Sequence, residues 1–395
     1  MLKLRDLDLR NKTVFLRVDF NVPLDKNLAI TSDARIKAAL PTLNYLLDQG
    51  AKVVAASHLG RPKGQILPQF SLKPVAERLS RRLSREVFLA PDVIGTRVDK
   101  LKSDLLNGQI LLLENLRFYT EETSNDRDFA RELAKEIDCY VNDAFGACHR
   151  AHASVVAITE FIKKAAAGFL VEKEVRFLNK LIHNPDKPFV AILGGAKVSD
   201  KIPVIENLLT KADAILIGGA MAYTFFAAQG YGVGQSLVDK DKFELANQIL
   251  IKAKEKGVNL QLPQDHIVSL SMDDQTPIQI IESFPIPSEL MALDIGPKTV
   301  KAYSDIIHSA KTVLWNGPMG VFEIDPFSEG TTQIAKAVAA SESLSIVGGG
   351  DSVSAVQKAG VSDLISHIST GGGASLEYIA KESLPGIDVL LEQQK

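Results

Sequence analysis

The feature that most constrains the fold of this 395-residue chain is the repeated alternation of short apolar runs with helical patterns. Each run has the length of a strand, and the segments between runs show helical periodicity. Such alternation is typical of parallel sheets whose strands are connected by helices. In the first half we therefore predict strands at Thr13–Val18, Lys52–Ser57, Ile110–Leu113 and Cys139–Asn142, and helices at Asp33–Gln49, Ser71–Leu83 and Ser124–Ile137.

The second half of the chain continues the pattern. A single hydrophobic core seldom serves more than about 250–300 residues, so a chain of this length indicates two domains. We predict an α/β protein with two domains, in which parallel sheets are flanked by helices. The strands expected in the second half are Phe189–Leu193, Ala214–Ile217, Leu260–Pro263, Leu293–Pro297, Thr312–Asn316 and Leu344–Val347.

An amphipathic segment at 168–182 separates two halves that differ in chemistry. Val171, Val175, Leu178 and Ile182 repeat at helical spacing, and prolines follow shortly after. Every arginine lies before or within this segment, and the diglycine and triglycine clusters lie after it. The pattern predicts a central helix that joins two domains, although a helix inside one large domain remains an alternative.

Charged residues of the first half follow the predicted strands directly. Arg61, Arg117 and Arg150 each come after a strand, and Arg35 opens a helix. Open parallel sheets bind ligands beyond the carboxyl ends of their strands, so these side chains are expected on one rim. Guanidinium groups bind carboxylate and phosphate in a bidentate manner. The rim therefore indicates a site for a small anion with several charges.

Other polar residues near the same strand ends have less specific patterns. His58 and His149 are interpreted as donors to the anion, and His152 as a structural residue, because no metal-ligand spacing joins them. Asp19 and Asn21 suit a substrate hydroxyl, but a turn role before Pro23 explains them equally well.

Glycines follow the predicted strands of the second half. Gly194–Lys201 has glycines that let a ligand approach the backbone, followed by a helix start, but it is not a Walker A loop. Lys197 and Lys201 suit a phosphate chain, although two solvated lysines are equally compatible with the sequence. Asp351 follows a triglycine, where it suits either magnesium or a simple helix cap. Residues 369–375 indicate a hinge or a further anion site.

Composition excludes several classes of function. The formal net charge is −3 and the basic residues form no long run, which argues against nucleic-acid or membrane partners. The two cysteines match no metal motif and indicate a reducing compartment. The charged N-terminal segment does not resemble a signal peptide, and no apolar run is long enough to span a bilayer. A cytoplasmic location is expected.

Several of these motifs together resemble the phosphoglycerate kinase family. In family order they are RVDFNVP at 17–23, SHLGRP at 57–62, ENLRF at 114–118, HRAH at 149–152, GGAKVSDK at 194–201, WNGPMGVFE at 315–323, GGGDS at 348–352 and STGGGAS at 369–375. The resemblance covers essentially the whole chain. It departs from the usual pattern at Cys148 and Thr120, neither of which carries a family role, although Cys148 introduces an oxidisable group near the rim.

The resemblance implies two doubly wound domains joined by the central helix, and it implies a reaction. The expected parts are a phosphoglycerate-binding domain at 1–167, an interdomain helix at 168–184, a nucleotide-binding domain at 185–374 and a tail at 375–395 that packs back on the first domain. The implied enzyme is a glycolytic transferase, a monomeric kinase that moves a phosphoryl group between 1,3-bisphosphoglycerate with ADP and 3-phosphoglycerate with ATP. Domain closure and Mg²⁺ are expected, and no general base.

The resemblance also implies roles for individual residues. Arg35, Lys201, Gly371 and Gly372 are the expected catalytic residues, and Asp351 the magnesium ligand. The expected phosphoglycerate ligands are Asp19, Phe20, Asn21, Arg35, His58, Leu59, Gly60, Arg61, Arg117, His149 and Arg150. The expected nucleotide ligands are Gly195, Ala196, Lys197, Lys201, Gly219, Gly296, Asn316, Glu323, Gly348, Gly349, Gly350, Asp351 and Ser352.

Two other classes of protein also use glycine-rich strand–helix turns. A nicotinamide dehydrogenase would show GxGxxG with an acidic residue about 20 positions further on, and this motif is missing from the sequence. A non-catalytic nucleotide-binding module would not require the arginine rim. Activity with ATP and 3-phosphoglycerate separates these alternatives from the kinase.

Overall fold

The computed structural model describes residues 1–199 and 201–392, which form two compact units. Unit 1 comprises Met1–Arg176 and the described part of Ser383–Lys395, and unit 2 comprises Phe177–Glu382. The boundary falls inside one continuous helix, α6 (Phe169–His183). Val171, Leu178 and Ile182 of the predicted apolar stripe are buried along this helix.

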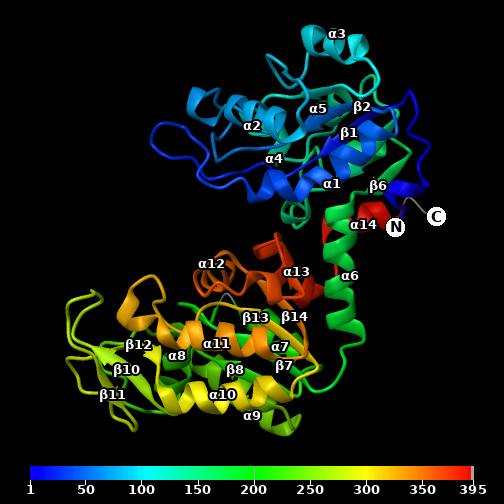
Figure 1. Ribbon diagram of the computed structural model, residues 1–395. Coiled ribbons are helices and arrows are strands. Elements are labelled where there is room, and N and C mark those ends of the chain that lie inside the picture. Colours follow the sequence, from blue (N-terminus) through cyan, green and yellow to red (C-terminus); the bar gives the residue numbers. More distant parts are fainter. Residues whose placement is uncertain (200, 393–395) are drawn as a thin grey trace. The chain divides into compact units, whose positions relative to one another are not determined.

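Unit 1 is built on a six-stranded parallel sheet with the order β3-β4-β2-β1-β5-β6 (Figure 1). The strands are β1 (Thr13–Arg17), β2 (Lys52–Ala56), β3 (Val87–Leu89), β4 (Ile110–Leu112), β5 (Cys139–Asn142) and β6 (Ala165–Ala167). The helices are α1 (Ala34–Asp48), α2 (Lys73–Leu83), α3 (Thr96–Asp104), α4 (Thr120–Thr123), α5 (Arg127–Leu133) and α14 (Pro385–Glu392).

Burial on both faces explains the continuous apolar run of β1. Val14 and Leu16 belong to the core that includes Leu43 of α1. Phe15 points the opposite way and stacks on Tyr140 of β5, with 6.1 Å between ring centroids. A strand covered on both faces has no solvent side and therefore lacks a polar alternation.

Unit 2 is built on a second six-stranded parallel sheet, with the order β15-β14-β13-β7-β8-β9. Its strands are β7 (Phe189–Leu193), β8 (Ala214–Ile217), β9 (Asn259–Gln261), β13 (Thr312–Asn316), β14 (Leu344–Gly348) and β15 (His367–Ile368). The helices are α7 (Ile202–Leu208), α8 (Met221–Ala228), α9 (Phe243–Glu255), α10 (Pro297–Ser309), α11 (Glu329–Ala340), α12 (Gly350–Lys358) and α13 (Gly373–Lys381). Side chains of α10, α11 and α12 form one core with β7 and β13.

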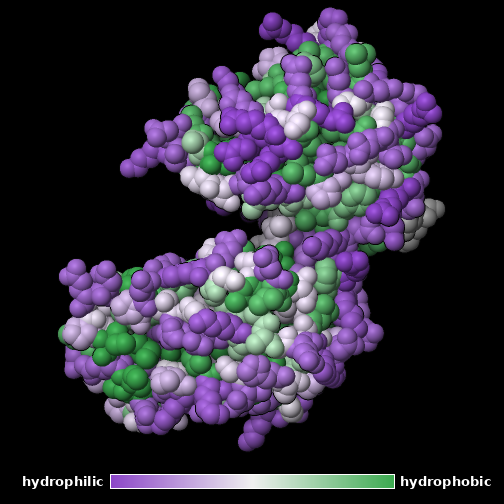
Figure 2. Space-filling model, viewed as in Figure 1, coloured by the Kyte–Doolittle hydropathy of each residue, from purple (hydrophilic) through white to green (hydrophobic). Residues whose placement is uncertain are grey.

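The sequence analysis missed a small antiparallel sheet in unit 2. It consists of β11 (Gln279–Ile281), β10 (His266–Ser269) and β12 (Met291–Ile295), in that order. The predicted strand Leu293–Pro297 is in fact the later part of β12 and the start of α10. The hairpin exposes Leu270, Met272, Ile278 and Ile280, and Figure 2 shows hydrophobic surface where this sheet lies.

The expected fold class is confirmed: the chain has two α/β domains with parallel sheets and flanking helices. In each large sheet the strand order reverses at one point, between β1 and β5 in unit 1 and between β7 and β13 in unit 2. Loops at a reversal diverge and leave a crevice beyond the strand ends. Among the described residues, no helix is long and apolar enough to cross a membrane.

The chain returns to unit 1 at its end. The amide of Gly386 in α14 donates to the carbonyl of Cys148 (2.9 Å). A side chain at position 386 would collide with Cys148 and Val155, so glycine permits this close approach. Cys148 is fully buried and burial raises its thiol pKa to about 12. Oxidation requires an exposed thiolate, so this thiol is protected in the folded protein.

Candidate active site

The loops that follow β2, β4 and β5 bring three of the four predicted arginines of unit 1 to one cavity, and Arg35 is not part of its lining. Arg61, Arg117 and Arg150 line a cavity of about 460 Å³. The sequence analysis did not assign the remaining residues of the lining to the site: they are Lys63, Gly64, Tyr119, Thr120, Thr123 and His152. Four basic side chains around one cavity make it suitable for an anion.

Hydrogen bonds hold these loops together. The amide of Gly60 donates to the side-chain oxygen of Asn21 (2.9 Å), and Nη1 of Arg117 donates to the Gly60 carbonyl (2.8 Å). Asn115, which is fully buried, donates to the carbonyl of Leu59 (2.7 Å) and accepts from its amide (3.2 Å). The loops after β1, β2 and β4 are therefore positioned by polar contacts made before any ligand binds.

Arg117 retains hydrogen-bonding capacity for a ligand. Its Nε atom is buried and has no hydrogen-bond partner among the residues that the structure describes. Burial, together with the nearby charges of Arg17 and Arg150, lowers the pKa of Arg117 to about 10. The guanidinium remains charged at neutral pH, and an anion in the cavity would supply the missing partner and relieve the repulsion between cations.

Asp19 and Arg35 form an ion pair beside this cavity. Burial raises the pKa of Asp19. The charges of His58, Arg35 and Arg17 lower it, and the net pKa of Asp19 lies below its ordinary value. His58 contributes to this lowering only when protonated. At neutral pH the guanidinium groups of Arg35 and Arg17 are responsible, together with the Asn21 amide, which donates to Asp19 Oδ1 (3.1 Å). Asp19 is thus an ionised acceptor, suited to a substrate hydroxyl.

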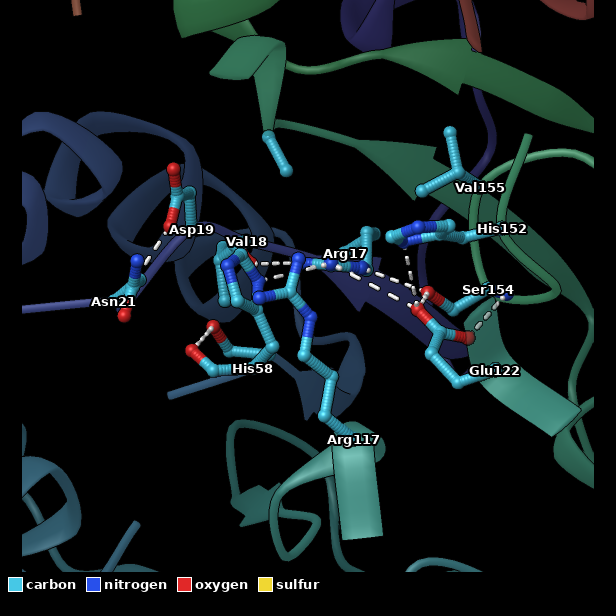
Figure 3. A network of polar contacts seen from close by, with 12 residues as sticks. Arg17, Val18, Asp19, Asn21, His58, Arg117, Glu122, His152, Ser154 and Val155 are labelled. Atoms are coloured by element: carbon cyan, nitrogen blue, oxygen red, sulfur yellow. Dashed lines mark hydrogen bonds and ion pairs between the residues drawn. The ribbon is translucent and has the colours of Figure 1, made fainter. Parts of the chain in front are cut away.

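A buried polar network surrounds Arg17 (Figure 3). Arg17 donates through Nε to Ser154 Oγ (2.8 Å), and Ser154 Oγ donates to Glu122 Oε1 (2.6 Å). His152 Nδ1 lies 3.8 Å from the same carboxylate oxygen. Burial and the neighbouring arginines lower the pKa of His152 to about 3, so it is neutral. The sequence analysis assigned no role to Arg17, Glu122 or Ser154.

The pocket of unit 2 lies beyond the ends of β7, β13 and β14 and has a volume of about 460 Å³. Ten predicted residues line it: Gly195, Ala196, Lys197, Lys201, Asn316, Gly349, Gly350, Asp351, Ser352 and Gly372. Five further lining residues lay outside the prediction: Gly194, Gly317, Pro318, Gly373 and Leu376. Gly219, Gly296, Glu323, Gly348 and Gly371 do not line this pocket.

The glycines of unit 2 serve two different purposes. A Cβ at Gly194, Gly219 or Gly317 would collide with the backbone of a neighbouring strand end, so these residues permit close packing. A Cβ at Gly195, Gly350 or Gly373 would enter open space. Packing therefore does not require glycine at the second group. At Gly195 the φ of +106° itself favours glycine. At Gly350 and Gly373 neither packing nor φ does, and a ligand that approaches the backbone amides would explain the missing side chains.

Polar side chains complete the floor of this pocket. Lys201 donates through Nζ to the side-chain oxygen of Asn316, and Asn316 donates to the Gly348 carbonyl (2.7 Å). Ser352 is fully buried, and its hydroxyl accepts from the Gly317 amide (2.6 Å). Ser352 therefore orients the loop after β13 within the unliganded site.

Asp351 is exposed in the first turn of α12 and lines the same pocket. Among the described residues no group of three or more His, Cys, Asp or Glu side chains is arranged to hold a metal ion. A single carboxylate fits Mg²⁺ bound chiefly through phosphates and water, which is the usual mode for this ion in nucleotide sites.

Comparisons with known proteins agree along the whole chain. The family model described as phosphoglycerate kinase matches residues 4–382. The chain is 56% identical to the phosphoglycerate kinase of Koribacter versatilis, with 98% of each chain covered, and 53% identical to that of Moorella thermoacetica, with 99% of each covered. The phosphoglycerate kinase structure from Coxiella burnetii has a TM-score of 0.92 and 41% identity, with 100% of each chain covered.

Proposed function

Because the chain belongs to the phosphoglycerate kinase family, we propose that it transfers a phosphoryl group between 1,3-bisphosphoglycerate and ADP, giving 3-phosphoglycerate and ATP, and catalyses the reverse reaction. The chain is thus a kinase of glycolysis. The observation that carries the proposed reaction is the presence of two different anion sites, one in each unit. The first is lined by guanidinium groups and the second by glycine backbone.

In this proposal unit 1 binds the phosphoglycerate. Arg61, Arg117 and Arg150 hold the phosphate that is not transferred, with further contacts from His58 and His149. The ligand set includes Asp19, Phe20, Asn21, Arg35, Leu59 and Gly60. The unsatisfied Nε of Arg117 supports this assignment, because a phosphate supplies the acceptor that the protein lacks.

Unit 2 binds the nucleotide in this proposal. The amides near Gly195 and Gly350, together with Lys197 and Lys201, hold the phosphate chain. Gly219, Gly296 and Glu323 contact the nucleoside, and Asn316, Gly348, Gly349 and Ser352 complete the phosphate site. Asp351 holds Mg²⁺, which when bound neutralises charge on the nucleotide phosphates.

The transfer itself requires positive charge and alignment rather than a base. The acceptor is a carboxylate with an ordinary pKa of about 4, so it is already ionised at neutral pH. Arg35 and Lys201 stabilise the charge that develops on the moving phosphoryl group, with help from the amides of Gly371 and Gly372. Donors of this kind act on the transition state more than on the bound substrates.

The proposed sites belong to different units, so transfer requires a closure that brings the reacting atoms to about 3–3.5 Å. The domain roles proposed are phosphoglycerate binding by 1–167, connection by 168–184 and nucleotide binding by 185–374, with 375–395 as the returning tail. Residues 393–395 of that tail lie outside the described residues. The hinges are 168–182, 185–188 and the glycines 371–373.

We further propose a cytoplasmic monomer. In this proposal one chain supplies the ligands of both sites, so no second copy is needed to complete either site. The two cysteines are free and buried, which suits a reducing compartment. Sedimentation at assay concentrations tests the state of assembly, and an obligate dimer with a shared site would contradict it.

The function is tested by incubating the purified protein with ATP, Mg²⁺ and 3-phosphoglycerate and coupling the acyl phosphate formed to a dehydrogenase that oxidises NADH. We expect turnover that depends on all three components. An ATP-binding protein that shows no turnover in either direction would contradict the proposal.

A further inference from the structure

Arg17, at the end of β1, is a fully buried charged residue whose side chain donates in three directions. Towards the protein interior it donates to Ser154, and its Nη2 atom lies 3.9 Å from Glu122 Oε1. Its Nη1 atom donates to the carbonyl of Val18. Its Nη2 atom also lies 3.3 Å from Nδ1 of His58 (Figure 3).

The contact with His58 fixes where the imidazole proton resides. A guanidinium has only donors, so the His58 Nδ1 atom must accept and cannot carry a proton. A neutral imidazole with an unprotonated Nδ1 carries its proton on Nε2. The opposite edge of the ring therefore presents one N–H donor without a positive charge.

We propose that Arg17 is a positioning residue that locks His58 as the neutral Nε2–H tautomer, so that His58 offers the phosphoglycerate an oriented neutral donor. Glu122 and Ser154 hold the guanidinium in place from the opposite side. The substrate named in this inference rests on the proposed function. The tautomer of His58 is a property of the protein alone.

The arginines around His58 act in the same direction as burial. Burial lowers the pKa of His58, Asp19 raises it, and Arg17, Arg117 and Arg35 lower it, with a net pKa well below its ordinary value. Arg17 also donates to Nδ1, the atom that protonation would require. Removal of Arg17 would free this atom and take away one of the charges that lower the pKa, so the pKa of His58 should rise toward the range where histidine ordinarily titrates.

A neutral donor has a functional advantage at this position. The arginines already supply charge to the anion, and a further cation would repel them in the empty cavity. A locked tautomer keeps the hydrogen bond to substrate available at every physiological pH. The pH dependence of substrate binding then reflects the charge of the substrate rather than a change in the charge of His58.

The tautomer is measured directly by long-range ¹H–¹⁵N correlation spectra of the full-length enzyme labelled at its seven histidines. A His58→Gln variant assigns the His58 signals by their loss. We expect the neutral Nε2–H pattern from about pH 5.5 to 8.5, without titration. An Nδ1–H pattern, or protonation of His58 in this range, would overturn the proposal. This experiment needs neither substrate nor an Arg17 variant, so its outcome is independent of the proposed reaction.

Kinetics separate positioning from a merely structural role. The double variant Arg17→Met/Glu122→Gln removes both buried charges, and Glu122→Gln alone keeps Arg17 beside His58. The substrate phosphate itself titrates near pH 6, so the quantity to compare is the ratio of variant to wild-type KM for 3-phosphoglycerate at each pH.

We expect this ratio to change by about tenfold between pH 5.5 and 8 in the double variant, with a smaller change in kcat. For Glu122→Gln the ratio should stay constant with pH, even if thermal stability falls. A constant ratio in both variants would show that Arg17 only supports the fold. A pH-dependent ratio in Glu122→Gln would equally contradict the assignment.

Discussion

Lys201 donates through its ammonium group to the side-chain oxygen of Asn316, which lies at the end of β13. Asn316 is almost completely buried and donates in turn to the carbonyl of Gly348. The lysine is thus held over the ends of β13 and β14 before any nucleotide arrives. A charge oriented in advance is the arrangement expected for a group that acts on the transition state.

The first prediction concerns this lysine. Lys201→Ala should lower kcat by about 10²–10³-fold while the KM for ATP changes much less, because the charge matters most when the phosphoryl group is in transit. Steady-state kinetics with both substrates varied measures the two effects. Lys252→Ala, which removes an exposed lysine paired with Glu206, is the matched control. A raised KM with unchanged kcat would mark Lys201 as a ground-state binder.

The second prediction distinguishes the two kinds of glycine. Gly350→Ala places a methyl group in open space within the pocket, so the KM for ATP should rise by about tenfold with little change in melting temperature. Gly317→Ala is the comparison, because its φ of +99° and the nearby Gly194 backbone both oppose a side chain. That variant should lose stability. Equal losses of stability in both variants would contradict the distinction between glycines that packing requires and glycines that leave room for a ligand.

The third prediction concerns magnesium. Asp351→Asn keeps the size of the side chain and removes its charge, so the Mg²⁺ concentration for half-maximal activity should rise by about tenfold at saturating ATP. Titration of activity with Mg²⁺ measures the shift. An unchanged requirement would show that Asp351 does not hold the metal ion.

The fourth prediction follows from a buried carboxylate. Asp294 at the end of β12 accepts from the amides of Gly330 (2.7 Å) and Ile295 (2.9 Å), yet burial raises its pKa to about 8. Between about pH 4 and 8 the unfolded chain has lost this proton and the folded protein keeps it. Asp294 therefore lowers stability as pH rises through this window, by up to about 1.4 kcal/mol per unit.

Asp294→Asn cannot ionise, so the free energy of unfolding of the variant relative to wild type should improve by about 2–4 kcal/mol from pH 5 to pH 8. Denaturant titrations followed through Trp315, the single tryptophan, report on unit 2 directly. The exposed Glu255 of α9 provides the control Glu255→Gln. A difference that is independent of pH would mean that Asp294 is ionised in the folded protein.

The fifth prediction concerns closure. In the proposed function each substrate alone contacts one unit and would have little differential affinity for a closed form, so both should be needed together. Small-angle scattering of four samples tests this: the free enzyme, each ligand alone, and both with a non-reacting nucleotide. Only the last should be markedly more compact. Full compaction with nucleotide alone would exclude the requirement for two ligands.

The elements that the sequence predicted well are those with an unbroken apolar run. Phe189–Leu193, for example, is buried at every position, so its five residues were predicted to their exact bounds. The hairpin strand β11 could not be predicted in this way, because Ile280 is exposed and its neighbours show no alternation. Pairing with β10 rather than local pattern makes this segment a strand.

The same reasoning explains which residues of the two cavities the sequence could predict. Arg61 and Arg117 follow their strands directly, and a general rule about strand ends locates such residues. Arg17 is the last residue of the strand β1. A single charged residue next to an apolar run does not by itself indicate a role in a site. Its partners Glu122 and Ser154 come from distant segments, and no spacing in the sequence connects them. Three-dimensional structure was needed to bring them together.

The return of α14 to unit 1 has a consequence for synthesis of the protein on the ribosome. Unit 2 ends at Glu382, so its residues have all been translated while unit 1 still lacks the helix that contacts Cys148. Domains generally fold as units during translation, with the earlier one first. Here the order of completion is reversed: the part of the chain made first is the last to receive all of its secondary structure.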